Sequence, residues 1–228
     1  MRNLSQKVLT DEEYRRVVAA IDALLADPDS LARRAGLVAI MGLATGLRQN
    51  ELRRLCWEHV NFSTGTVRVT RLKARGPDWT KGVPESGAVT DTMTISADVL
   101  DRLRPLRRHF GPMFVTSRGT PVGARTLLND WRLVMARAGL ERPRTHGARG
   151  MHVMRHTYAT RLARKTKKPF VVRDALGHKN IATSIAYVEN DPEEIRRAVT
   201  EAFRTDAFAD DGSEAIAQRV AALLRKTA

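Results

Sequence analysis

The feature that most constrains this chain is a run of 12 apolar and small residues, GLVAIMGLATGL, from Gly36 to Leu47. It is too short to cross a bilayer, which needs about 20 apolar residues in a helix, and a charged residue, Arg48, follows at once. The run overlaps a segment, Ser30 to Ala44, that is typical of a helix buried over a wide face and ended near Gly46. We therefore expect a folded protein built on a buried helix, with no membrane partner.

Composition narrows the class further. Apolar residues make up 43% of the 228 positions, which is enough for a real core. The N-terminus lacks the apolar stretch of a secretory signal, and a single cysteine, Cys56, cannot form an internal disulfide or a zinc cluster. These features favour a cytoplasmic protein. We expect Cys56 to be a small core residue beside Trp57.

Charge is the strongest global signal. Lys and Arg number 39 against 25 Asp and Glu, a net charge of +14. Ten of the basic residues lie between Glu141 and Arg173, and the sequence turns acidic after Tyr187. Such a distribution favours binding to a polyanion. There are two alternatives: the protein comes from an organism whose proteins are generally rich in arginine, or the basic residues form a solvent-exposed face that binds no ligand.

Helical periodicity dominates the chain, and the fold class we predict is α+β, mainly α with a small antiparallel β-hairpin. Two alternating segments, Thr66–Thr70 and Val89–Ser96, are expected to be strands, joined by a long loop rich in Gly and Pro. The predicted helices are Thr10–Leu25 (opened by a capping box), Ser30–Ala44, Asn50–Trp57, Ala97–Arg108, Ala124–Ala138, His152–Lys165, Phe170–Leu176, Ile181–Val188, Pro192–Phe203 and Ser213–Arg225.

Two segments expected to be helical carry arginines in positions suited to binding phosphate. ATGLRQNEL places Arg48 at the mouth of a helix, with Glu51 three positions on, where its carboxylate can hold the guanidinium. In HVMRHTYAT, His152 and Arg155 are three positions apart, so both can project from one helical face. Forked cations of this kind bind the non-bridging oxygens of a phosphodiester and stabilise charge that develops on them.

Two further segments supply a proton donor and a nucleophile. Lys73 follows the first strand closely, and LGHKNIATSIAY carries His178 and, nine positions later, Tyr187. A phenol can attack phosphorus once its proton is removed, and a lysine can protonate the leaving oxygen. The chain has neither a carboxylate cluster for magnesium nor a GxxxxGK[ST] loop, so we expect no metal and no cofactor.

The three motifs ATGLRQNEL, HVMRHTYAT and LGHKNIATSIAY, in this order, resemble those of the tyrosine recombinase (phage integrase) family, over about Leu9 to Glu194. The resemblance implies the catalytic-domain fold of that family and double-stranded DNA as partner. It implies a site-specific recombinase or integrase that cuts and rejoins DNA through a 3′-phosphotyrosyl intermediate, without metal or ATP. It also implies a homotetramer on paired DNA sites, while the free protein could be a monomer.

The resemblance carries roles onto matching residues. Arg48 and Arg155 would bind the scissile phosphate, with Glu51 supporting the first. Lys73 would be the general acid for the 5′-oxygen, and His152 would assist as general base.

The same resemblance gives the last motif its roles. His178 would hydrogen-bond the scissile phosphate, and Tyr187 would attack it. Further DNA-binding residues are expected at Arg71, Arg75, Arg144, Arg149 and Lys179.

Alternatives remain open at two of these positions. Tyr158 lies beside the His–Arg pair and competes with Tyr187 on proximity, and Lys81 lies in the same loop as Lys73. The other histidines fit no motif position and are expected to be structural or exposed: His59, His109, His146 and His156. Two rival functions are a non-catalytic DNA-binding module on the same fold and a DNA relaxer of the type IB topoisomerase kind.

The domain organisation expected is one catalytic domain over residues 1–228. Family members usually carry an N-terminal DNA-clamping domain, which is expected to be absent from this sequence because the catalytic pattern begins near Leu9. The chain is then either a catalytic fragment of a longer enzyme or a naturally short member. The amphipathic segment Ser213–Arg225 either packs on a neighbouring protomer, as tails of this family do, or folds back on its own core.

Overall fold

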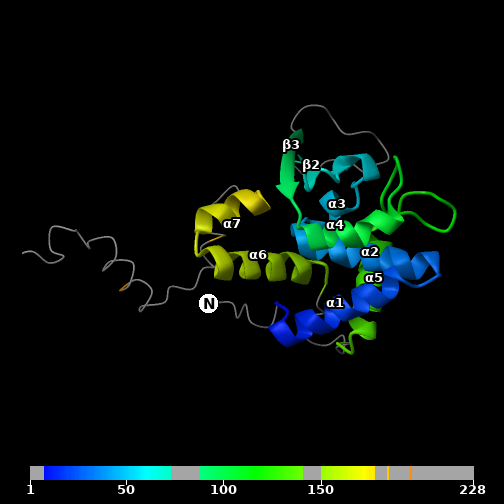
Figure 1. Ribbon diagram of the computed structural model, residues 1–228, viewed down its shortest axis with the longest axis horizontal. Coiled ribbons are helices and arrows are strands. Elements are labelled where there is room, and N and C mark those ends of the chain that lie inside the picture. The colour runs from blue at the N-terminus through cyan, green and yellow to red at the C-terminus, as the bar shows by residue number, and fades with distance from the viewer. Residues whose placement is uncertain (1–7, 73–87, 141–149, 178–183, 185–195, 197–228) are drawn as a thin grey trace, which may run out of the picture. The chain divides into compact units, whose positions relative to one another are not determined.

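The computed structural model describes residues 8–72, 88–140, 150–177, 184 and 196 of the chain (Figure 1). The chain divides into two compact units, residues 1–188 and 189–228. Every helix and strand named below belongs to the first unit. Within the described ranges, no helix is long and apolar enough to cross a membrane.

The buried helix predicted from the apolar run is α2, Ser30–Thr45. The Asp29 side chain caps its start by accepting from the Leu31 backbone N–H, and Gly46 ends it with a left-handed φ of 61°. The most extensive contacts of α2 are with α1 (Asp11–Leu25), α5 (Ala124–Arg137) and α6 (His152–Thr166). Every residue from Ala35 to Leu43 is buried, so α2 is enclosed on all sides beyond its first turn.

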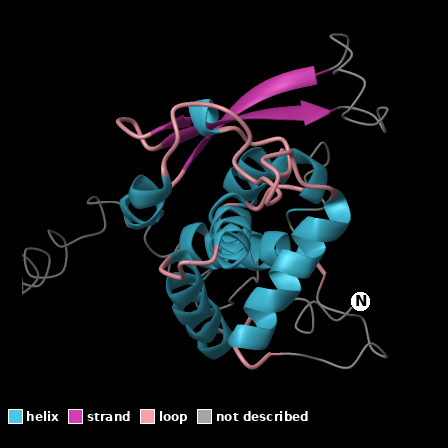
Figure 2. Cartoon of the chain, turned by 90° about the vertical axis from the view of Figure 1, so that its right-hand side faces the viewer, coloured by secondary structure: helices cyan, strands magenta, loops and turns pink. Residues whose placement is uncertain are grey.

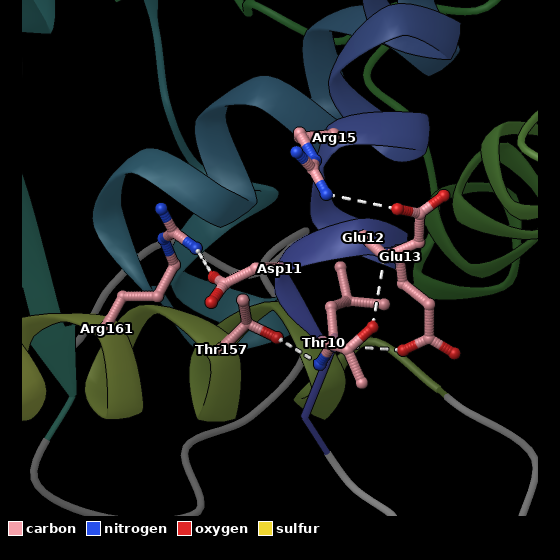
Figure 3. A network of polar contacts seen from close by, with 8 residues as sticks. Thr10, Asp11, Glu12, Glu13, Arg15, Thr157 and Arg161 are labelled. Carbon is pink, nitrogen blue, oxygen red and sulfur yellow. Dashed lines mark hydrogen bonds and ion pairs between the residues drawn. The ribbon is translucent and has the colours of Figure 1, made fainter.

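The start of α1 is joined to α6 by polar contacts (Figure 3). The predicted capping box is confirmed, since Thr10 and Glu13 exchange side-chain and backbone hydrogen bonds. The Leu9 backbone N–H donates to the buried Thr157 hydroxyl at 3.1 Å, and Arg161 Nη1 donates to Asp11 at 2.6 Å. One face of α6 is thereby held by α1.

A three-stranded antiparallel sheet lies at one edge of the helices (Figure 2). Its order is β1 (Val60–Asn61), β2 (Thr66–Leu72) and β3 (Ala88–Thr94), with Val67 opposite Met93. Val67, Val69 and Met93 are buried while Arg68 and Thr92 are exposed, the alternation that a half-buried sheet requires. The predicted hairpin is confirmed, whereas β1 was not predicted because two residues carry no periodic signal.

The prediction of a helix from Asn50 to Trp57 was wrong. Helix α3 spans only Gln49–Leu52, and a 3-10 helix, η2, covers Trp57–His59. Between them Met113 N–H donates to the Leu55 carbonyl and Trp57 N–H donates to the Gly111 carbonyl, at 2.9 and 3.0 Å. Pairing with a distant segment therefore replaces the helix.

The extended backbone also corrects the prediction for Cys56. Leu55 and Trp57 on either side are buried, and alternation turns Cys56 outward, so its side chain is only half-buried. Burial still raises the pKa of the thiol, with the Glu58 carboxylate adding to the effect.

The helix predicted over Ala97–Arg108 is shorter than expected. Helix α4 ends at Leu103 and a 3-10 helix, η4, follows over Arg104–Leu106. Pro105 has no backbone N–H and cannot continue an α-helix. The last described helix is α7, Pro169–Leu176, ended by Gly177 with a left-handed φ of 60°.

The predicted helices Ile181–Val188, Pro192–Phe203 and Ser213–Arg225 lie outside the described residues, apart from Ser184 and Arg196, which are helical. The single-domain organisation and the role of the tail stay predictions.

Candidate active site

Arg48 stands at the entrance of α3 and is held there by Glu51. Its backbone N–H donates to Glu51 Oε2 at 2.8 Å, and its Nη1 lies 3.2 Å from Oε1 of the same carboxylate. Glu51 is buried while 49% of the Arg48 side chain is exposed. A buried carboxylate therefore anchors an exposed guanidinium, as predicted, and both Glu51 oxygens are used by one arginine.

Arg155 occupies the opposite kind of environment, because only 6% of the residue is exposed. Its Nη1 donates to the Gly46 carbonyl at 2.8 Å, and its Nη2 donates to the Leu176 carbonyl at 2.9 Å. Gly46 ends α2 and Leu176 is the last residue of α7, so both acceptors lie at the negative ends of helix dipoles. The guanidinium thus joins α2, α6 and α7.

His152 begins α6 and is exposed, one turn before Arg155. The ring of His156 lies 6.4 Å from that of His152, centroid to centroid, and is half-buried. The sequence assigned no site role to His156. The spacing of four residues on a helix was the signal that could have placed the two rings together.

Tyr158, the alternative nucleophile, packs against Gly46 at the end of α2. A Cβ atom built on Gly46 would lie 2.6 Å from Tyr158 Cδ1, so the ring rests directly on the glycine. Tyr158 also packs on a small cluster formed by Ala159, Ala163, Val172 and Leu176. Its aromatic ring therefore fills the space between α2, α6 and α7.

The remaining predicted site residues lie outside the described part of the chain. Arg71 is seen only as backbone, paired with Val89 in the sheet. The others are Lys73 with its alternative Lys81, and Arg75, Arg144, Arg149, His178, Lys179 and Tyr187. His146, for which no site role was predicted, also lies outside the described residues. Leu72 and Gly177 are described and directly precede Lys73 and His178 in the chain.

A pocket lined by described residues lies elsewhere. Its volume is about 780 Å³, and its walls come from α1, α2, α4 and α6. Apolar side chains such as Ile21, Leu43 and Val99 line it, and it shares Tyr158 with the surroundings of Gly46. An exposed guanidinium at the head of α3 suits a ligand that lies on the surface better than one enclosed in this pocket.

Within the described residues, no group of three or more His, Cys, Asp or Glu side chains could hold a metal ion. The arrangement at Arg48 and Arg155 is instead suited to an anion. Comparison of the sequence with known families gives a match to the phage integrase family over residues 7–194. The chain belongs to the phage integrase family.

Relatives of this integrase-family chain are named as tyrosine recombinases. The XerC-like protein of Caldanaerobacter subterraneus is 24% identical over an alignment of 221 residues, gaps included, and the match covers 85% of this chain and 53% of the relative. The XerD protein of Lacticaseibacillus casei is 30% identical over 173 residues, covering 73% and 55%. The chain spans about half the length of the curated relatives it matches.

Solved structures establish the fold of the integrase-family chain as that of a tyrosine recombinase catalytic domain. The XerH recombinase bound to its difH substrate superposes with a TM-score of 0.61 at 20% identity, covering 85% of this chain and 54% of that one. The catalytic domain of bacteriophage HP1 integrase gives 0.58 at 20% identity, covering 90% and 98%. The predicted fold is confirmed.

Proposed function

We propose that this chain is the catalytic part of a site-specific DNA recombinase, which cuts and rejoins double-stranded DNA through a 3′-phosphotyrosyl link to Tyr187. The observation that carries the proposal is the bonding of Arg155. One buried guanidinium joins the Gly46 turn, which leads to Arg48, and the end of α7, which leads to His178. The three motif segments, far apart in sequence, therefore converge on one residue.

In the proposed reaction, the Tyr187 oxygen attacks the scissile phosphorus and the bond from phosphorus to the 5′-oxygen breaks. His152 assists removal of the phenol proton, and Lys73 delivers a proton to the departing 5′-oxygen. Arg48 and Arg155, with His178, stabilise the charge that develops on the non-bridging oxygens. A guanidinium has five N–H donors, so two carbonyl bonds of Arg155 are compatible with a phosphate contact.

Rejoining is the same reaction in reverse. A 5′-hydroxyl attacks the phosphotyrosyl phosphorus, the Tyr187 oxygen leaves, and the phosphodiester re-forms. The covalent link conserves the energy of the broken bond, so the scheme needs neither ATP nor a metal ion.

Double-stranded DNA is the proposed substrate. The net charge of +14 favours a polyanion, and homologous recombinases and integrases, including XerH and the Tn1549 integrase, have been solved with DNA. We propose Arg71, Arg75, Arg144, Arg149 and Lys179 as further DNA contacts. A homotetramer on two paired sites is the proposed active assembly.

The test is a covalent adduct assay. The chain is incubated, without metal or ATP, with nicked duplexes that include the flanks of its own gene, and the products are separated in SDS. We expect an SDS-resistant protein–DNA adduct that Tyr187→Phe abolishes and that Tyr158→Phe retains, because the Tyr158 ring packs against Gly46.

The assay separates the alternatives. An adduct that persists in Tyr187→Phe and disappears in Tyr158→Phe would move the nucleophile to Tyr158. Salt-sensitive DNA binding without any adduct would favour the non-catalytic module. Relaxation of supercoiled DNA of arbitrary sequence, with no exchange between paired sites, would favour the topoisomerase-like activity.

A further inference from the structure

Arg54 is a half-buried cation for which no described residue of the chain provides an acceptor. It lies in the turn directly after α3, and its Nε and Nη1 are both buried with no hydrogen-bond acceptor. Throughout the described part of the chain, its guanidinium also has no ion-pair partner. Buried donors are almost always paired in folded proteins, so two on one side chain call for an explanation.

Two other arginines of this chain have acceptors within the fold, although Nε of neighbouring Arg53 is, like the two atoms of Arg54, buried without one. Arg34 donates to both carboxylate oxygens of Asp130, at 2.8 and 2.9 Å, and to the Val115 carbonyl at 3.1 Å. Arg155 donates to two carbonyls. The fold thus provides protein acceptors for the guanidiniums of Arg34 and Arg155, and Arg54 differs from them in having none among the described residues.

The surroundings of Arg54 favour an anion from outside the protein. The segment 48–54 carries three arginines and a single carboxylate, Glu51, whose two oxygens are both taken by Arg48. Helix α3 also packs against β2, where Arg68 is exposed. No free carboxylate of this segment is available to Arg54, and the local field attracts negative charge.

We infer that Arg54 binds a phosphate of the DNA backbone close to the scissile one. The inference rests on the proposed function, since it takes DNA as the ligand. Arg54 follows Arg48 by six residues of helix and turn, a rise of about 9 Å at 1.5 Å per residue. That separation exceeds the axial rise of about 3.4 Å per nucleotide of one strand, so Arg54 is assigned a neighbouring phosphate and not the one at Arg48.

Because acceptors are missing in the free protein, the Arg54 side chain gains hydrogen bonds when it binds DNA. In the free protein, Nε and Nη1 have exchanged water for an enclosed site in which no described residue offers an acceptor. A phosphate offers several oxygens, and a rotation of the flexible side chain toward it restores two charge-assisted hydrogen bonds. Arg54 is therefore unfavourable for the free fold and favourable for the complex.

The opposite effects of Arg54 on stability and on DNA affinity can be tested with the full chain and the variant Arg54→Met. Methionine keeps much of the length of the side chain without its charge. Stability is measured by urea unfolding, and affinity is measured by fluorescence anisotropy with a labelled duplex over a series of salt concentrations. We expect stability unchanged or raised, and binding weakened about tenfold. The slope of log affinity against log salt should fall by about one, because one phosphate contact is lost.

The control is Arg118→Met, which removes an exposed charge from the loop near Thr116 and should leave the salt slope as in wild type. An unchanged salt slope in Arg54→Met, or a loss of stability, would overturn the inference and make Arg54 a structural residue. Wild-type protein that does not bind the duplex would overturn it as well. Wild-type protein that binds but forms no covalent adduct would overturn the proposed cleavage and leave the role of Arg54 standing.

Discussion

The guanidinium of Arg155 donates to the main-chain carbonyl of Gly46 across 109 residues of sequence, at 2.8 Å. A second bond, to Leu176, extends the same side chain to α7. Both acceptors are main-chain carbonyls at helix ends, whose positions do not depend on side-chain rotamers. The geometry around the proposed phosphate site is therefore set by packed helices and by one arginine between them.

Arg155→Met should destabilise the fold by about 2–4 kcal/mol, because two buried carbonyls lose their donor. Arg155→Lys should rescue only part of the loss, since an ammonium cannot span two acceptors as a planar fork does. Urea unfolding at neutral pH measures the free energy. Arg164→Ala, an exposed change on the same helix, should stay within about 0.5 kcal/mol of wild type. A similarly small change in Arg155→Met would contradict a bonding role at Gly46 and Leu176.

Glu51→Gln should reduce adduct formation more than it reduces DNA binding. The amide can still accept from the Arg48 backbone N–H, but it no longer holds the guanidinium with a negative charge. The expected loss of stability is about 1 kcal/mol. Adduct yield and anisotropy, measured on the same preparation, separate the two effects.

The matched control for that change is Glu12→Gln. Glu12 pairs with Arg15 at 3.0 Å, but both side chains are at least 70% exposed, so its loss should cost less than about 1 kcal/mol. Equal effects of the two variants on adduct yield would remove Glu51 from the site.

Gly46→Ala should be costly for two separate reasons. The φ of 61° is a left-handed conformation that alanine disfavours by about 1–2 kcal/mol, and the new methyl group would meet the Tyr158 ring at 2.6 Å. Gly119→Ala isolates the first cost, because Gly119 has a φ of 78° and open space around its Cβ position. The variant at Gly46 should therefore lose more free energy of unfolding than the variant at Gly119. Equal losses would show that the Tyr158 ring moves aside at little energetic cost.

His59 should make stability depend on pH. Burial, reinforced by the nearby Arg68 charge, lowers its pKa below the ordinary value of 6.5. The folded state then binds a proton less readily than the unfolded state, so the stabilisation is complete above the unfolded pKa. It is lost as pH falls from about 6.5 toward the folded pKa.

His59→Asn tests this dependence, because its side-chain oxygen can still accept from the Cys56 backbone N–H that His59 Nδ1 accepts in wild type. Free energies of unfolding over the acid range should fall less steeply in this variant. The exposed His109→Asn is the control and should follow wild type. Parallel pH profiles for wild type and His59→Asn would remove His59 as the source.

Local signals determined much of the fold in advance. The capping box at Thr10, the apolar run of α2 and the alternation of β2 depend on neighbours within a few positions, so they can be recognised in the sequence. The motif spacings likewise predicted that Arg48 is held by Glu51, because three positions on one helix suffice for that contact. The family and the catalytic-domain fold followed from the same motifs.

Only the tertiary structure decided where long-range pairing overrides local preference. Helix α3 ends early because the strand-like segment after it pairs with residues 111–113, a partner more than 50 residues away. The two carbonyls bound by Arg155, and the lack of an acceptor for Arg54 among the described residues, depend on how separate helices meet. Side-chain type and spacing give the capacity of a residue to bind, whereas packing decides whether the fold or a ligand satisfies it.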